Sequence, residues 1–143
     1  MNVLTSITVL GFLIFFHEMG HFLAAILQGI YVDGFSIGFG PSIIQKKFRD
    51  ITYSFRAFPL GGFVSFPDEE LNNIDPKDPN LLKNRPIIQR VIVISAGVFA
   101  NLILAYSILI INVTTVGIPF DPEPGILVLA TQPEKAASLA GLE

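Results

Sequence analysis

The sequence predicts a membrane protein of the α-helical class, with two transmembrane helices joined by a loop that contains β structure. Two apolar stretches, 3–27 and 91–118, are each long enough to cross the roughly 30 Å of hydrocarbon in a bilayer. Hydrophobic residues make up 51% of the 143 residues and charged residues 15%, which is too apolar for an ordinary soluble domain. The net charge of −3 gives no basic excess for nucleic acid, and the absence of cysteine excludes disulfides and thiolate metal sites.

Residues 1–28 are predicted to form the first transmembrane helix. The stretch 3–27 contains no Lys, Arg or Asp. A cleaved signal peptide has a basic start and a short apolar core, whereas here the first basic residue is Lys46 and the apolar stretch is about 25 residues long. We therefore expect this helix to be retained in the mature protein.

Inside this apolar stretch lies an H-E-x-x-H motif, from His17 to His21. Residues i and i+4 share one face of a helix, so the two imidazoles can reach one metal ion. Glu18 can reach a water beside that ion and act as a general base, as the metal lowers the pKa of the water to about 7. Gly20 leaves room for a neighbouring segment. The motif predicts a metal-dependent hydrolytic site within the membrane.

Other interpretations of the motif are open. The histidines could form hydrogen bonds between helices, and Glu18 could pair with a lysine elsewhere. The protein could also be non-catalytic, binding metal for transport or sensing, or serving as a membrane anchor. However, an ionisable residue at the bilayer centre costs on the order of 3 kcal/mol, which favours function for three of them at metal-ligand spacing. Catalytic zinc usually has three protein ligands, and only two are visible here.

The loop between the two helices divides into a β-segment, 29–66, and a polar part, 67–90. Glycine alternates with aromatic and β-branched residues, which predicts short strands at 34–41, 51–55 and 61–64 with a polar turn at 45–50. The many aromatics suggest a sheet that lies against or dips into the membrane; a small cytoplasmic hairpin domain is the alternative. We expect residues 67–84 to form a flexible surface loop.

The basic residues predict the orientation of the chain. Eight of the nine Lys and Arg residues fall between 46 and 90, so the positive-inside rule places the loop 29–90 on the cytoplasmic side. Both ends of the chain then lie on the other side, and the protein is a multi-pass membrane protein.

The second transmembrane helix is predicted at 91–118. Arg85, Pro86 and Arg90 suit a helix entrance at the cytoplasmic interface, and Pro119 with the Pro-rich acidic stretch 121–124 ends the helix. A strand at 125–129 and the start of a helix at 133–142 follow.

Taken together, the chain resembles the N-terminal part of site-2 proteases, the membrane-embedded zinc metalloproteases, and in particular their bacterial and plastid branch with an inserted PDZ domain. Four features carry the resemblance, in the order in which the family has them: Phe16-His17-Glu18-Met19-Gly20-His21-Phe22; Gly38-Phe39-Gly40-Pro41 followed by Pro59-Leu60-Gly61-Gly62-Phe63-Val64; Gly97-Val98-Phe99-Ala100-Asn101; and Pro133-Glu134-Lys135-Ala136-Ala137 through Gly141-Leu142.

The resemblance implies an intramembrane zinc endopeptidase that cleaves transmembrane proteins, such as anti-sigma factors, in a bacterial inner membrane or a plastid or thylakoid membrane. It implies Zn²⁺ ligation by His17 and His21 and catalysis by Glu18. It also implies that Asn101, together with Gly97, Gly61 and Gly62, handles the substrate, and that 119–143 opens a PDZ-like domain. A membrane substrate must unwind, and strand addition would give its freed amides new partners.

The chain departs from the family pattern in two places. Val98 stands where the family usually has proline, and we expect little consequence. The family's third zinc ligand is an aspartate in an L-D-G motif on a later helix, and no L-D-G occurs in this sequence. Asp33, Asp50 and Asp68 lie in unsuitable contexts, although Asp33 could approach the metal by chance. We therefore expect an N-terminal fragment of a longer protein, inactive alone.

Overall fold

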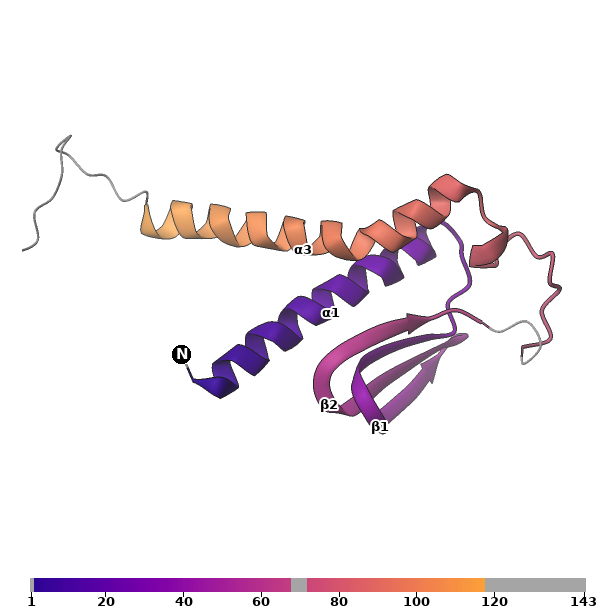
Figure 1. Cartoon of the computed structure of the whole chain (residues 1–143), viewed down its shortest axis with the longest axis horizontal. Helices are drawn as coiled ribbons and strands as arrows, with labels where there is room; N and C mark the ends of the chain where they lie inside the picture. The colour runs from indigo at the N-terminus through magenta and orange to yellow at the C-terminus, as the bar shows by residue number, and fades with distance from the viewer. Residues whose placement is uncertain (1, 68–71, 118–143) are drawn as a thin grey trace, which may run out of the picture. The chain divides into compact units, whose positions relative to one another are not determined.

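The structure is a computed structural model that describes residues 2–67 and 72–117. The expected beginning of a PDZ-like domain, 119–143, lies outside the described residues. The order of elements is helix α1 (Val3–Leu27), strands β1 (Gly34–Phe48) and β2 (Ile51–Ser65), a short 3-10 helix η1 (Leu82–Asn84) and helix α3 (Ile87–Val116). Both long helices have the length and apolar composition needed to span a membrane. This confirms two helices apolar enough to span a membrane, with strands between them (Figure 1).

Helix α1 ends at Leu27, one residue before the end of the predicted range 1–28. Gly29 follows with φ +67°, a conformation that glycine adopts at little cost. The amide of Gly29 donates to the carbonyl of Ile26 and the amide of Ile30 donates to the carbonyl of Ala25, each at 3.0 Å. These two bonds form a Schellman motif, which satisfies carbonyls that the end of a helix leaves free.

The helix α3 differs in its bounds from the predicted range 91–118. It begins at Ile87, directly after Pro86, whose carbonyl accepts a hydrogen bond from the amide of Arg90. The polar residues of the first turn therefore belong to the helix. It ends at Val116, because Gly117 has φ +84° and its amide donates to the carbonyl of Val113. Glycine thus ends this helix before Pro119 can.

The β-segment consists of two strands of 15 residues each and not of several short ones. They form an antiparallel pair joined by a two-residue turn, with Phe48 opposite Ile51. Positive φ angles at Gly38, Gly40 and Gly61 bend the strands without ending them, which is why the glycine pattern was a poor guide to strand length.

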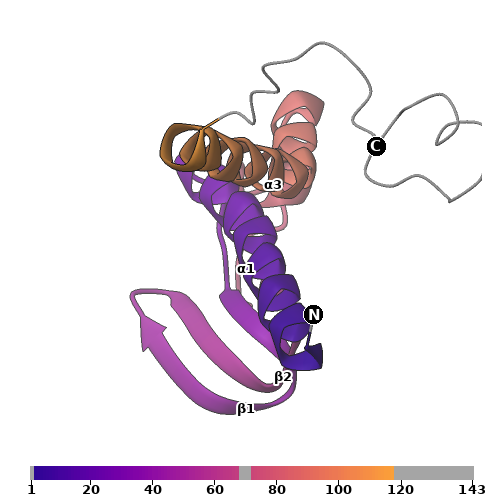
Figure 2. The same cartoon turned by 90° about the vertical axis from the view of Figure 1, so that its left-hand side faces the viewer.

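Because the strands bend, the beginning of β1 has β2 on both of its sides. Phe35 is opposite both Tyr53 and Val64 in the register. Figure 2 shows the bent pair along its length, beside α1. In both views α1 lies between the sheet and α3.

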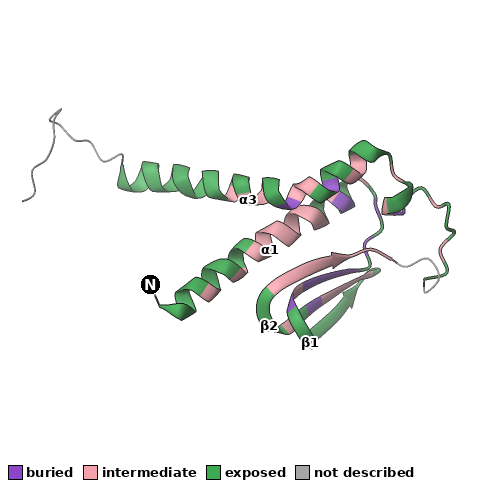
Figure 3. Ribbon diagram, in the orientation of Figure 1, coloured by how far each residue is buried: buried purple, intermediate pink, exposed green. Residues whose placement is uncertain are grey.

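A small core forms where α1, α3 and the sheet meet. Ala25, Ile30, Val32 and Val93 are buried there. On the sheet side, the ring of Phe22 lies 5.2 Å from that of Phe35, measured between centroids. Buried and half-buried residues gather in this region, while the first turns of α1 and most of α3 are exposed, as expected for surfaces that face lipid (Figure 3).

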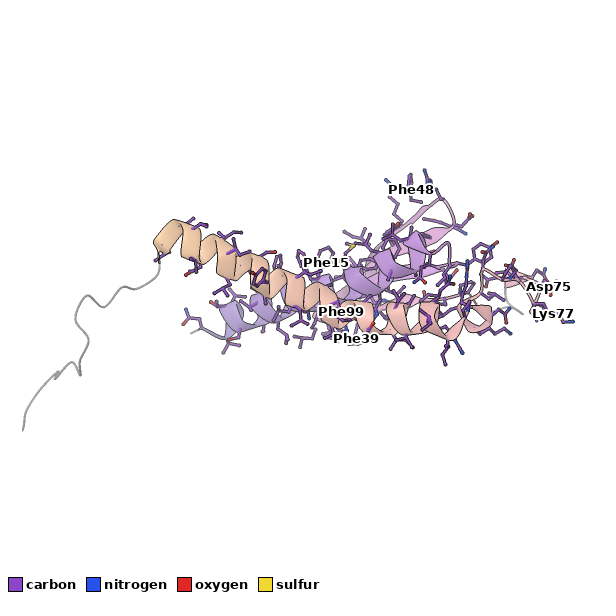
Figure 4. All side chains as sticks on the ribbon, turned by 90° about the horizontal axis from the view of Figure 1, so that it is seen from above. Phe15, Phe39, Phe48, Asp75, Lys77 and Phe99 are labelled. Atoms are coloured by element: carbon purple, nitrogen blue, oxygen red, sulfur yellow. The ribbon has the colours of Figure 1, made fainter. Side chains whose placement is uncertain are left out.

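Between the sheet and α3, residues 72–84 of the polar segment make specific contacts with the rest of the chain, and the flexibility predicted for 67–84 stays a prediction. Leu81 is buried, and the amide of Tyr31 donates to the carbonyl of Asn80 at 3.0 Å. A guanidinium nitrogen of Arg85 donates both to the carbonyl of Gly29 and to the side-chain oxygen of Asn80. The end of α1 is thereby tied to the start of α3. Figure 4 labels Asp75 and Lys77 in this segment and Phe48 at the hairpin turn.

Candidate metal centre and substrate groove

The two histidines of the motif converge as the sequence predicts. Their Nε2 atoms are 3.2 Å apart, and both residues are half-buried. Two nitrogens that each lie about 2.1 Å from a tetrahedral zinc ion are separated by about 3.4 Å. The pair is therefore spaced as two ligands of one ion. His17 lies ten residues before the end of α1, about 15 Å along the helix axis, which places the pair inside the apolar span.

A backbone carbonyl on α3 orients one of these imidazoles. The Nδ1 atom of His21 lies 2.7 Å from the carbonyl oxygen of Val93. A carbonyl can only accept, so Nδ1 carries the hydrogen and the lone pair of Nε2 points toward His17. Metal-binding histidines are commonly held in this way through their second nitrogen. This contact could not be predicted from the sequence, because every residue carries a backbone carbonyl and nothing marks that of Val93.

Two glycines make room at the point where the helices cross. A Cβ on Gly97 would overlap His21 Nε2 and lie 2.7 Å from His17 Nε2, so the absence of a side chain there leaves space for both imidazoles. A Cβ on Gly20 would overlap the carbonyl oxygen of Ala96 and lie 2.8 Å from the Cβ of Ala100. The space predicted beside Gly20 is thus filled by α3. Gly97, expected among the substrate residues, lies against the imidazoles.

The base predicted from the motif lies against the sheet. A Cβ on Gly62 would be 2.9 Å from Cγ of Glu18 and 2.9 Å from the carbonyl oxygen of Ser36. Only a glycine lets strand β2 approach Glu18 this closely. Glu18 is half-buried, lies against strand β2 at Gly62 and lines the same groove as His17.

A groove of about 480 Å³ brings most of the predicted site residues together. It is lined by side chains of α1, by the sheet and by one residue of α3: Leu10, Leu13, Ile14, His17, Glu18, Phe39, Gly61, Gly62 and Asn101. A second hollow, of about 300 Å³, also borders Glu18 and Gly62, and includes His21 and Val93. The sequence had linked the glycines and Asn101 to the motif only through the family resemblance.

The apolar wall of the groove was missed at the sequence level. Leu10, Leu13 and Ile14 precede His17 at helical spacing of three and four residues, so they share its face of α1. That spacing was visible in the sequence, but in a helix that is apolar all round it does not stand out from lipid-facing residues.

Asn101 is the only residue of α3 in this groove. Its side-chain oxygen is buried and has no hydrogen-bond partner among the described residues. A buried acceptor without a partner costs free energy, on the order of 1–3 kcal/mol, unless a ligand or water supplies a donor. The side chain therefore suits contact with an N–H group that enters the groove.

No third ligand joins the histidines within the part of the chain that the structure describes. No group of three or more His, Cys, Asp or Glu residues is placed there to hold a metal ion. Asp33, considered as a chance ligand, lies instead in another hollow, with Lys47 and Asp50. The two nitrogens, the oriented tautomer and the space at Gly97 nevertheless fit a metal ion such as zinc.

Comparison with known proteins agrees with this geometry. The sequence model of peptidase family M50 matches residues 5–140. The chain belongs to peptidase family M50. It is 51% identical over 143 residues to "Membrane metalloprotease ARASP, chloroplastic" of Arabidopsis thaliana, covering 99% of this chain and 32% of that protein. It is 53% identical over 138 residues to "Putative zinc metalloprotease all3971" of Nostoc sp., covering 96% of this chain and 38% of that protein.

Family membership confirms the resemblance seen in the sequence. The chain spans about a third of the length of these relatives. The H-E-x-x-H helix, the β-segment and the helix with Gly97 and Asn101 all lie inside the matched region.

Proposed function

We propose that this chain forms the H-E-x-x-H half of the active site of an intramembrane zinc metalloendopeptidase. The observation that carries the proposal is the pair of Nε2 atoms 3.2 Å apart, with Glu18 next to His17 in the helix and bordering the same groove in an apolar span. The names of the M50 relatives support zinc as the metal. Catalytic zinc takes three protein ligands, so the proposal requires a third from residues beyond those described.

In this proposal each residue has a defined task. His17 and His21 would hold zinc, which would supply Lewis acidity at the scissile peptide bond. Glu18 takes the proton from the attacking water and returns it to the leaving amine. Asn101 accepts a hydrogen bond from an amide of the unwound substrate, and the β2 residues Gly61 and Gly62 lie along the substrate strand.

The proposed substrates are single-span membrane proteins, such as anti-sigma factors, cleaved within the bilayer as in regulated intramembrane proteolysis. A helix must unwind before its peptide bonds can be attacked, and a neighbouring strand offers partners for the freed amides. We place the loop 29–90 on the cytoplasmic side, because eight of the nine Lys and Arg residues lie within it. A bacterial inner membrane or a plastid or thylakoid membrane fits this arrangement.

Metal removal tests the proposal directly. The full-length protein in liposomes is expected to cleave a single-span membrane protein inside its span, with the cut located by mass spectrometry. Chelation with 1,10-phenanthroline should abolish cleavage, and added Zn²⁺ but not Mg²⁺ should restore it, because imidazole suits zinc and not magnesium. Cleavage that survives complete loss of zinc, or zinc flux without cleavage, would overturn the proposal.

Asn101→Ala provides a test of the substrate role. Loss of a hydrogen bond to the substrate amide is expected to lower kcat/KM about tenfold, with zinc content unchanged. Ser107→Ala on the same helix is the matched control, because its hydroxyl only bonds the carbonyl of Ile103 and faces outward. Equal kinetics for the two variants would remove Asn101 from the site.

A further inference from the structure

Arg56 on β2 is a charged residue in a mostly apolar β-segment, and its guanidinium bonds to two positions of β1. Its Nε donates to the hydroxyl of Ser36 at 3.2 Å, and one terminal nitrogen donates to the carbonyl of Gly40 at 2.8 Å. Its central carbon lies 5.0 Å from the centroid of the Phe63 ring. One side chain thus connects both ends of the bend in β1 with the last part of β2.

These contacts occur where the strands bend and bring β2 to the groove that Glu18 lines. Ser36 is buried and lies opposite Phe63 in the register. Phe63 directly follows Gly62, the residue that lies against Glu18. Movement of Phe63 away from β1 would therefore move Gly62 relative to the base.

Glycine makes this stretch of backbone easy to displace. Gly38, Gly40 and Gly61 all have positive φ, and the register is irregular between Ile37 and Ile44. Glycine-rich irregular strands specify their register weakly. A planar guanidinium, with donors in a fixed fork and a face that stacks on an aromatic ring, can fix such a stretch in one geometry.

We infer that Arg56 is a positioning residue: it fixes the folded-over sheet so that Gly61–Phe63 lies beside Glu18 in the geometry that receives a substrate strand. This inference rests on the proposed peptidase function. Arg56 does not line the groove, so it acts through the strand and not on the substrate.

The kinetic test uses Arg56→Gln in the full-length protein in liposomes. We expect KM for a single-span membrane substrate to rise about tenfold while kcat changes less than about twofold and zinc content stays constant, because binding is impaired and the metal centre is untouched. Arg56→Lys should give an intermediate KM, since lysine keeps the charge but cannot reach both oxygens from one plane. Arg49→Gln at the hairpin turn is the matched control and should behave as the parent.

A distance measurement tests the same inference without relying on cleavage. The chain has no cysteine, so cysteines at Leu23 on α1 and Leu60 on β2, both exposed, can carry spin labels. Pulsed dipolar spectroscopy should give a narrow distance distribution for the parent and for Arg49→Gln, and a broad or shifted one for Arg56→Gln.

The two readouts separate the possible failures. If the parent does not cleave but Arg56→Gln broadens the distance distribution, the peptidase proposal fails and the positioning of the strand stands. If the parent cleaves and Arg56→Gln leaves both KM and the distribution unchanged, the role of Arg56 is overturned. A parent-like KM and a parent-like distance distribution for Arg56→Lys would equally contradict a role that depends on the planar guanidinium.

Discussion

Replacing Glu18 with glutamine is expected to abolish peptide-bond cleavage while leaving zinc bound. Glutamine has nearly the same shape as glutamate and fits between α1 and Gly62, but it cannot take a proton from water. Loss of a general base lowers rates by about 10²–10⁴-fold. Zinc content should not change, because the proposed ligands are the Nε2 atoms of His17 and His21, which lie 3.2 Å apart and do not include Glu18.

The measurement is single-turnover cleavage of a membrane substrate, paired with zinc stoichiometry on the same preparation. Asp50→Asn at the hairpin turn is a matched carboxylate-to-amide control in an exposed position, and it should cleave at the parent rate. Parent-like cleavage by Glu18→Gln would contradict the assignment of the base. Loss of zinc in Glu18→Gln would instead make Glu18 a ligand.

The convergence of His17 and His21 could be predicted from the sequence because its geometry is local. His17 and His21 are four residues apart in one helix, and helical periodicity alone places their imidazoles together. The end of α1 was equally local, since Gly29 closes a Schellman motif. Features that depend on two segments far apart in the chain were less accessible.

The sheet illustrates what the sequence could not supply. The glycine-rich pattern predicts short strands at 34–41, 51–55 and 61–64, but Gly38, Gly40 and Gly61 lie within two long strands that bend while their pairing continues. The contact between His21 and the carbonyl of Val93 joins residues 72 positions apart. No pattern of side chains predicts which backbone carbonyl will accept a hydrogen bond from a distant residue, so a contact of this kind is seen only in the structure.

Substituting Gly97 with alanine is expected to remove zinc from the site. The added Cβ would overlap His21 Nε2 and stand 2.7 Å from His17 Nε2, closer than a real Cβ approaches other atoms. The imidazole of His21 cannot turn away freely, because its Nδ1 is bonded to the carbonyl of Val93 on the same helix. Moving the ring breaks that bond, and leaving it in place forces the two helices apart.

The expected loss of zinc affinity is at least about tenfold, which is the lower end of the effect seen when the groups that orient metal ligands are disturbed. Cleavage should fall with zinc affinity. Helix propensity cannot explain such a loss, because alanine is the better helix former by about 1 kcal/mol. Gly11→Ala in α1 is the matched control, since its Cβ would only contact the Pro59 carbonyl at 3.5 Å. Zinc measured at fixed free metal should therefore fall in Gly97→Ala and not in Gly11→Ala; retention in both would mean that the imidazoles do not depend on the space beside α3.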